Sequence, residues 1–249
     1  MRKRCAAADT TTTGFYHNVV WSDFCNSILP KSEKIATAQA LARKGKRGWG
    51  SKKSKEFSRN LRGRQEVLKQ KGWGTERVWW VPILAKGKLH VEVLGVDFPG
   101  EEPAGASMFV DAVQRGLAVR FQAGTPKPSL LFVDRGRGFW CTKTGRVTAE
   151  LADALQGTGL SMFWGEDASV QPGYCADVVL HETAVAWIRR QLTETTPRRP
   201  WQETREQYAV RLRRVVTRIN NTHDVGGLCR KLDFRLGELI RRQGDRLRS

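Results

Sequence analysis

Five runs of aromatic and β-branched residues along the chain predict β-strands. The first is GFYHNVVWS, residues 14–22, and the next two, ERVWWVPIL and GKLHVEVL, flank Ala85–Gly87 as the arms of a hairpin. Pro82 lies inside the first arm, and because proline has no N–H to donate, that strand is expected to be an edge strand or to be bulged there. The last two runs are SLLFVD and LSMFWG, the latter at residues 160–165.

Apolar residues three or four positions apart predict helices between and after these strands. Phe109, Val113 and Leu117 recur every four residues in one helix. Ser32 is a suitable N-cap for the first predicted helix, and Thr148 for the helix at 148–157. The predicted helices span residues 32–44, 103–121, 148–157, 177–192, about 203–222 and about 225–243, the last two being basic. Three strands followed by alternating helices and strands predict a mixed α/β fold.

Two of the predicted strands run directly into an aspartate. In NVVWSDFCNSILP the apolar run ends at Asp23, and in LLFVDRGRG four apolar residues precede Asp134 and a glycine-rich turn. One acid at the end of a strand can occur by chance, but two acids in matched positions indicate a shared function. We therefore expect two strands of one sheet to carry these carboxylates to a common place.

A third acid, Glu182, lies in the predicted helix DVVLHETAVAWIRRQL. Val178, Val185 and Leu192 form a stripe at heptad spacing, and Glu182 lies four residues after the first and three before the second. An acid that faces a core is costly unless it is paired or bound to a metal. A glutamate that pairs with Arg189, or that extends to the solvent at the rim of the core, is the structural alternative to metal binding.

Three carboxylates from two strands and a helix suit a two-metal site for phosphoryl transfer. Two Mg²⁺ or Mn²⁺ ions about 3.5–4 Å apart need several hard oxygen ligands; one ion activates the attacking oxygen and the other stabilises the leaving oxygen. Sites in α/β proteins also lie at the carboxyl ends of strands. The pattern therefore predicts a metal-dependent reaction at a phosphodiester.

The positive charge of the chain is unevenly distributed. The formal net charge is +18. Residues 31–77 hold 15 lysines and arginines against 4 acids, residues 187–249 hold 16 against 7, and residues 78–186 hold 9 against 12. Two basic zones around an acid-bearing sheet predict nucleic acid as the partner, with a merely solvated basic insertion as the alternative.

The first basic zone is expected to contain an insertion that contacts DNA. Its stretch GKRGWGSKKSKEFSRNLRGR has glycines and cations but no apolar period, which predicts a loop that lies against DNA or is disordered without it. The candidate DNA-binding residues are Arg43, Lys44, Lys46, Arg47, Lys52, Lys53, Lys55, Arg59, Arg62 and Arg64.

Composition argues against several other classes of protein. The 249 residues are 40% hydrophobic, enough for a core, and the five cysteines include no CxxC pair, which argues against a disulfide framework or a cysteine zinc site. No apolar run approaches the roughly 18 residues of a membrane span, and the N-terminus lacks the apolar region of a signal peptide. The protein is expected to be soluble and intracellular, with no membrane partner and no small-molecule substrate.

Taken in order, these motifs resemble the catalytic domain of mariner-superfamily DDE transposases. VVWSDFCNSI is similar to the strand with the family's first catalytic acid, and VWWVPILAKGKLHVEVL to the hairpin that follows it. FVDAVQRGLAVRF and LLFVDRG are similar to the helix before the second acid and the strand that carries it. DVVLHETAVAWIRRQL is similar to the helix with the last acid and a trailing tryptophan, here Trp187. The resemblance covers about residues 14–195.

This resemblance implies an RNase H-like fold, a mixed sheet flanked by helices, with a basic insertion at about 31–76 after the first strand. The expected parts are a basic tail at 1–13, a catalytic domain at 14–195 and a basic helical region at 196–249. The catalytic and metal-binding residues for DNA cleavage and strand transfer would be Asp23, Asp134 and Glu182. The protein would act in the nucleus of a eukaryote or otherwise in the cytoplasm, and a homodimer is left open.

The chain also departs from the family pattern. Arginine follows Asp134 where the family has asparagine, QPGYCADVVLHE replaces the usual segment before the last acid, and 47 residues separate Asp134 from Glu182. Asp167 has a spacing nearer that of the family, so it is the rival third ligand, although it precedes the helix.

The short segment before the first acid leaves the function open between alternatives. Only 22 residues precede Asp23, too few for the helix-turn-helix modules of the family. The chain is therefore expected to be a fragment, to use its basic insertion instead, or to transpose no longer. The alternative function is a domesticated or truncated relative that binds nucleic acid without catalysis, and a third is an RNase H-like nuclease that acts on RNA–DNA hybrids.

Overall fold

The structure of the chain is a computed structural model that describes residues 18–37, 39–40, 75–97, 105–122, 124–133, 140, 142, 146–163, 180–228 and 241. Its strands are β1 (Val19–Ser22), β2 (Cys25–Pro30), β3 (Thr75–Ala85), β4 (Lys88–Val93), β5 (Leu130–Phe132) and β6 (Ser161–Met162). Its helices are α5 (Ala106–Arg120), α6 (Ala149–Leu155), α7 (Leu180–Glu194), the 3₁₀ helix η3 (Pro200–Gln202) and α8 (Arg205–Thr222).

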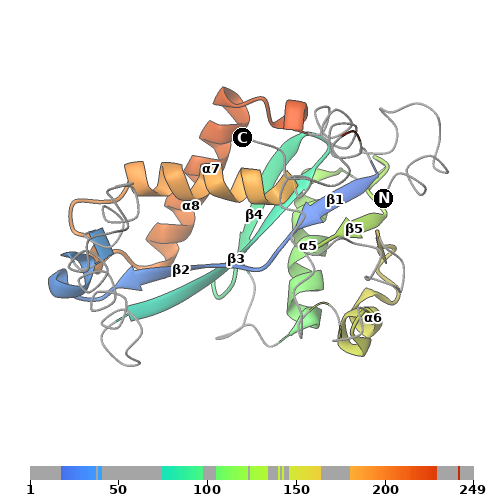
Figure 1. The fold of residues 1–249 in the computed structure, drawn as a ribbon, viewed down its shortest axis with the longest axis horizontal. Coiled ribbons are helices and arrows are strands. Elements are labelled where there is room, and N and C mark those ends of the chain that lie inside the picture. The colour runs from blue at the N-terminus through green and yellow to red at the C-terminus, as the bar shows by residue number, and fades with distance from the viewer. Residues whose placement is uncertain are drawn as a thin grey trace.

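The six described strands form one mixed, open sheet (Figure 1). β3 pairs antiparallel with β4, β1 and β2, whereas β1 pairs parallel with β5 and β5 pairs parallel with β6. The hairpin predicted around Ala85–Gly87 is β3–β4. Lys86 and Gly87 both have positive φ, as the two central residues of a type I′ turn require. The prediction of a mixed α/β fold is confirmed.

β1 and β2 are two halves of one long strand that is interrupted at Asp23 and Phe24. Both halves pair with β3 in one continuous register, and Pro82 is the β3 residue that this register sets opposite Asp23. The hydroxyl of Ser22 donates a 2.7 Å hydrogen bond to the carbonyl oxygen of Pro82. Since the N–H and C=O of one strand residue point to the same side, the donor that proline lacks is missing at this interruption.

The expectation that the strand with Pro82 is an edge strand or is bulged is wrong. Pro82 pairs with Val91 of β4 on its other side, and the register past it contains no extra residue. The sheet accommodates proline because the ladder is broken where its N–H would have donated. Pairing then resumes in β2, so Asp23 lies inside a long strand and not at the end of one.

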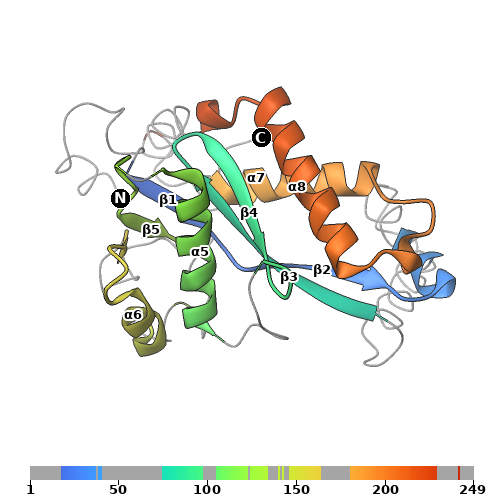
Figure 2. The ribbon, with the colours of Figure 1, turned by 180° about the vertical axis from the view of Figure 1, so that it is seen from behind.

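Two hydrophobic clusters fill the space on the two faces of the sheet (Figures 1 and 2). α7 and α8 cover one face, where Trp21, Trp80 and Phe132 are buried with apolar residues of both helices. α5 and α6 cover the other face, where Val20 and Leu131 are buried. Successive strand residues point to opposite faces, which is why Trp21 and Val20 belong to different clusters. The described residues therefore form three layers, with the sheet in the middle.

The sequence signals for two helix starts are confirmed. Thr148 caps α6 by accepting a hydrogen bond from the N–H of Leu151, and the hydroxyl of Ser32 accepts one from Ile35 at the start of a helical segment after β2. α5 and α8 lie within their predicted ranges, whereas α7 continues two residues beyond its predicted end. No helix among the described residues has the length and apolarity needed to cross a bilayer.

Two predictions concern residues that are partly or wholly undescribed. Of the helix predicted for 225–243, residues 225–228 are helical and residues 229–240 lie outside the described residues. The basic stretch at residues 41–74 also lies outside them.

Candidate active site

Asp23 is half-buried at the interruption between β1 and β2. Its Oδ1 accepts a 2.7 Å hydrogen bond from the N–H of Phe24, so the carboxylate closes onto the backbone where the ladder is broken. Trp21 and Cys25, two residues before and two residues after it, are buried in the cluster beneath α7 and α8. Strand alternation therefore assigns Asp23 to this same face of the sheet.

The two strands that lead to the aspartates are direct neighbours in the sheet. β1 and β5 are parallel, with Val19 opposite Leu130 and Trp21 opposite Phe132. The ring centroids of Trp21 and Phe132 lie 4.3 Å apart on the α7 face. Asp134 lies outside the described residues, but in the sequence it follows Leu130 by four positions, as Asp23 follows Val19.

Glu182 lies in the first turn of α7, and its side chain is exposed. The interpretation that it belongs to a core-facing stripe is wrong. The buried face of α7 is formed by Leu180, His181, Ala184, Val185, Ile188 and Leu192, so Glu182 lies at the rim beside that face. Glu182 therefore needs no metal to offset burial, because its side chain is exposed to solvent.

His181 is a buried polar residue that the sequence analysis missed. It is 1% exposed, and its ring centroid lies 6.4 Å from that of Phe132. Neither ring nitrogen has a hydrogen-bond partner among the described residues. Burial lowers the pKa of His181 to about 3, so the imidazole is neutral at physiological pH. The sequence contained a signal for this residue. In HETAV, residues 181–185, a histidine next to an acid has the spacing of the apolar face of the helix.

The pKa of the Cys25 thiol is affected by two charged residues on this face of the sheet. Burial raises the pKa of the Cys25 thiol to about 12; the negative charge of Asp23 acts in the same direction and the positive charge of Arg189 in the opposite one. Arg189 follows Glu182 by seven residues, or about two turns, so both lie on one side of α7. An acid of the strand and a cation of the helix therefore act on the same thiol.

A groove of about 420 Å³ extends along β2 beyond Asp23. Asn26 and Ser27 line it from β2, and Arg189 lines it from α7. Tyr208 lines it from α8 and donates a 2.6 Å hydrogen bond to the Ser27 hydroxyl. The groove thus lies between β2 and the two helices that cover this face of the sheet, and its lining begins at Asn26, three residues after Asp23.

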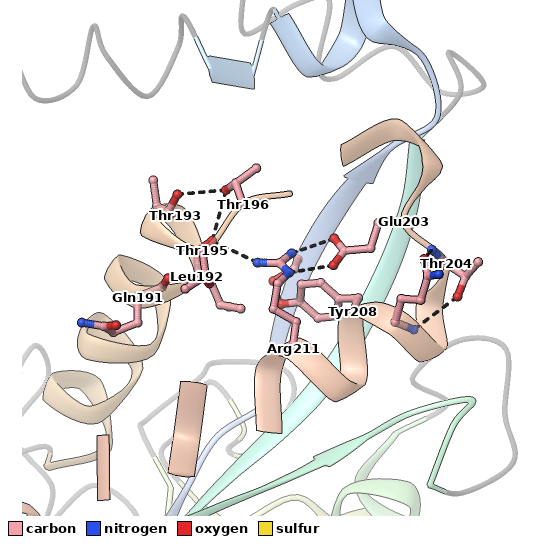
Figure 3. A network of polar contacts seen from close by, with 11 residues as sticks. Gln191, Leu192, Thr193, Thr195, Thr196, Glu203, Thr204, Tyr208 and Arg211 are labelled. Carbon is pink, nitrogen blue, oxygen red and sulfur yellow. Dashed lines mark hydrogen bonds and ion pairs between the residues drawn. The ribbon is translucent and has the colours of Figure 1, made fainter. Parts of the chain in front are cut away.

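A polar network contributes to the lining of this groove (Figure 3). The guanidinium of Arg211 donates two hydrogen bonds, of 2.6 and 2.7 Å, to the carboxylate of Glu203, and a third, of 3.0 Å, to the carbonyl oxygen of Leu192. Figure 3 shows Arg211 reaching from α8 to both partners, with Tyr208 beside it. The network joins the end of α7 to the start of α8.

Several predicted site residues cannot be compared with the structure. Asp134, the rival ligand Asp167 and the ten candidate DNA-binding residues between Arg43 and Arg64 lie outside the described residues. Within the described part of the chain, no three acidic, histidine or cysteine side chains come together as a metal site. Of the three predicted carboxylates, the structure therefore describes two, Asp23 and Glu182.

No family model matches the chain, and no curated protein is similar enough to be matched to it. The case for a function therefore rests on the residues and on the geometry of the sheet.

Proposed function

We propose that the chain is a divalent-metal-dependent enzyme that cuts DNA strands and joins them to new positions, in the manner of a DDE transposase. The observation that carries this proposal is the parallel register of β1 with β5. Val19 pairs with Leu130, and an aspartate follows each of these residues by four positions. If the register continues, Asp23 and Asp134 face each other on adjacent strands.

The topology of the sheet supports the fold that the proposal requires. The antiparallel hairpin β3–β4 lies on one side of β1, and β5 and β6 follow in parallel on the other side. Helices cover both faces. This arrangement is compatible with an RNase H-like fold, in which the first two acids come from neighbouring parallel strands.

Three carboxylates from different elements would together bind the metal ions. Asp23 is oriented by the N–H of Phe24, Asp134 would come from β5, and Glu182 would approach from the first turn of α7, with Asp167 as its rival. Carboxylate oxygens are the hard donors that Mg²⁺ and Mn²⁺ prefer, so these residues fit the ions. When bound, two such ions would activate the attacking oxygen and stabilise the leaving oxygen of a phosphodiester.

A second candidate function is nucleic-acid binding without cutting. The exposure of Glu182 favours it, because an exposed glutamate needs no metal to explain its place on α7. The formal net charge of +18 would serve this function equally well.

The test is a nicking assay on supercoiled DNA with Mg²⁺, with Mn²⁺ and with neither. We expect the wild-type protein to cut in the presence of either metal. Asp23→Asn and Asp134→Asn keep the shape of the side chain but remove its charge, so each should slow cutting by more than about 100-fold, since even small misplacements are costly. Asp111→Asn, an exposed acid on α5, is the matched control and should cut normally.

DNA binding by the same proteins separates the two functions. Both active-site variants should still bind DNA, because their basic residues are intact. Either variant cutting at the wild-type rate would remove that aspartate from the site. A wild-type protein that binds DNA but does not cut it with either metal would establish the second function instead.

A further inference from the structure

A second groove, of about 990 Å³, lies over the connection between α7 and α8. Arg198 and Arg199 line it from the loop that follows α7, and Arg214 lines it from α8. Gln207 and Val210 also line it from α8. They precede Arg214 by seven and four residues, which places all three on one face of the helix. We call this surface the arginine groove.

Three arginines of the arginine groove are not ion-paired with any acid among the described residues. Arg198, Arg199 and Arg214 are exposed, and within the described part of the chain no ion pair engages their side chains. The fourth arginine of the lining, Arg211, is held by Glu203 in the network of Figure 3. The groove therefore has three guanidinium groups available to an anionic ligand.

Glu206 is the other carboxylate in the lining. Hydrogen bonds from its own backbone N–H and from the Thr204 hydroxyl lower its pKa, so it stays charged and is held in the first turn of α8. It would repel an anion that entered the groove. This opposing charge makes Glu206 a useful probe, because removing it should have the opposite effect to removing an arginine.

The shape and the lining of the arginine groove indicate which kind of anion it can bind. Guanidinium groups recognise phosphate in a planar, two-pronged geometry, and the groove is open and far larger than one phosphate. Single-stranded nucleic acid is usually bound by aromatic rings that stack on the bases. The described residues that line this groove include no aromatic side chain, so its chemistry suits the sugar–phosphate backbone of a duplex.

The arginine groove adjoins the groove that extends along β2. Glu203 and Arg211 line both of them. β2 connects Asp23 to this region, and its six residues span about 20 Å, the length of about six base pairs. A duplex held at Asp23 could therefore reach the arginines.

We propose that Arg198, Arg199 and Arg214 bind the phosphate backbone of double-stranded DNA on the flank of the segment presented to Asp23. This inference rests on the proposed function, because it takes DNA as the partner of the candidate active site. It adds a binding surface made by the α7–α8 connection, whose residues are distant in the sequence from the basic stretch at 41–74.

The experiment measures the affinity of the full chain for a fluorescent 30-base-pair duplex in EDTA over a range of salt concentrations. Arg198→Ala, Arg199→Ala and Arg214→Ala are combined in one variant. If each arginine neutralises one phosphate, the slope of log Kd against log salt should fall by about 2.7. Glu206→Gln should bind more tightly than the wild type. The matched control combines Lys88→Ala, Arg115→Ala and Lys127→Ala, which are exposed cations outside the groove and remove the same charge.

Circular dichroism melting of each variant establishes that it is folded. Equal losses in the groove and control variants would overturn the inference, because net charge alone would then explain them. Wild-type affinity and slope in the groove variant would also overturn it, as would an effect confined to single-stranded DNA. Since binding is measured without metal, a protein that never cuts DNA would refute the proposed function while leaving this result unchanged.

Discussion

His181 is the clearest case of a single residue that opposes the stability of the fold. It is almost completely buried beside Phe132, and neither ring nitrogen has a partner among the described residues. A buried polar group without a hydrogen bond costs about 1–3 kcal/mol. We therefore predict that His181→Leu raises the free energy of unfolding by about 1 kcal/mol or more, as measured by urea denaturation at neutral pH.

His223 is the matched control for this prediction. It is half-buried, and its Nδ1 lies 2.9 Å from the hydroxyl of Thr222, so replacing it with leucine removes a satisfied group. His223→Leu should leave stability unchanged or lower it. A loss of stability in His181→Leu would show that the ring makes a favourable interaction and would contradict the prediction.

At the scale of elements, the ion pair of Arg211 with Glu203 holds α7, η3 and α8 together. Glu203 is 6% exposed and Arg211 is 17% exposed, so water screens this pair weakly. Removing one member of a buried pair leaves an uncompensated charge and costs about 3–5 kcal/mol. Arg211→Met should therefore destabilise the protein by about this amount, as measured by chemical denaturation.

Two further variants distinguish the lost pair from lost packing. The double variant Arg211→Met with Glu203→Leu should recover most of the stability, because no buried charge remains. Arg190→Met removes an exposed pair with Glu194 on α7 and should change stability by no more than about 0.5 kcal/mol. If the double variant were as unstable as Arg211→Met alone, the buried charge would not be the cause.

At the scale of the whole molecule, Glu76 joins three segments that are distant in the sequence. It lies on β3 and forms ion pairs with Lys31, which follows β2, and with Arg205, which begins α8. Burial acts to raise the pKa of Glu76, but the hydrogen bonds and charges of the two cations outweigh it and lower the pKa below the usual 4.5. The folded state thus favours the charged carboxylate.

The consequence is a dependence of stability on acid pH. A carboxyl group whose pKa is lowered by folding stabilises the protein above its unfolded pKa, and this contribution disappears as pH falls below about 4.5 toward the folded pKa. Glu76→Gln should therefore weaken the decline in stability below pH 4.5, as followed by thermal melting at several pH values. Glu33→Gln, an exposed acid before β3, should retain the wild-type decline. Parallel curves for the wild type and Glu76→Gln would contradict the role of this residue.

Local patterns in the sequence were sufficient for the fold class and for most of the elements, with β2 and η3 as exceptions. Strand propensity identified the runs that became β1, β3, β4, β5 and β6, and a single hydroxyl at Thr148 identified the start of α6. These features depend on neighbours within one strand or one helical turn, so they are visible in a short window. The matched positions of Asp23 and Asp134 are visible in the sequence for the same reason, because each is defined only by the apolar run that precedes it.

Long-range pairing accounts for what the sequence could not reveal. The strand continues past Asp23 as β2 because β3, about 60 residues further along the chain, pairs with both halves, and Pro82 removes a donor at the break. Which of two adjacent residues of α7 is buried depends on the packing of that helix against the sheet, which turned His181 inward and left Glu182 exposed. The arginine groove likewise exists only where the loop after α7 meets one face of α8, because burial and proximity are properties of the packed chain.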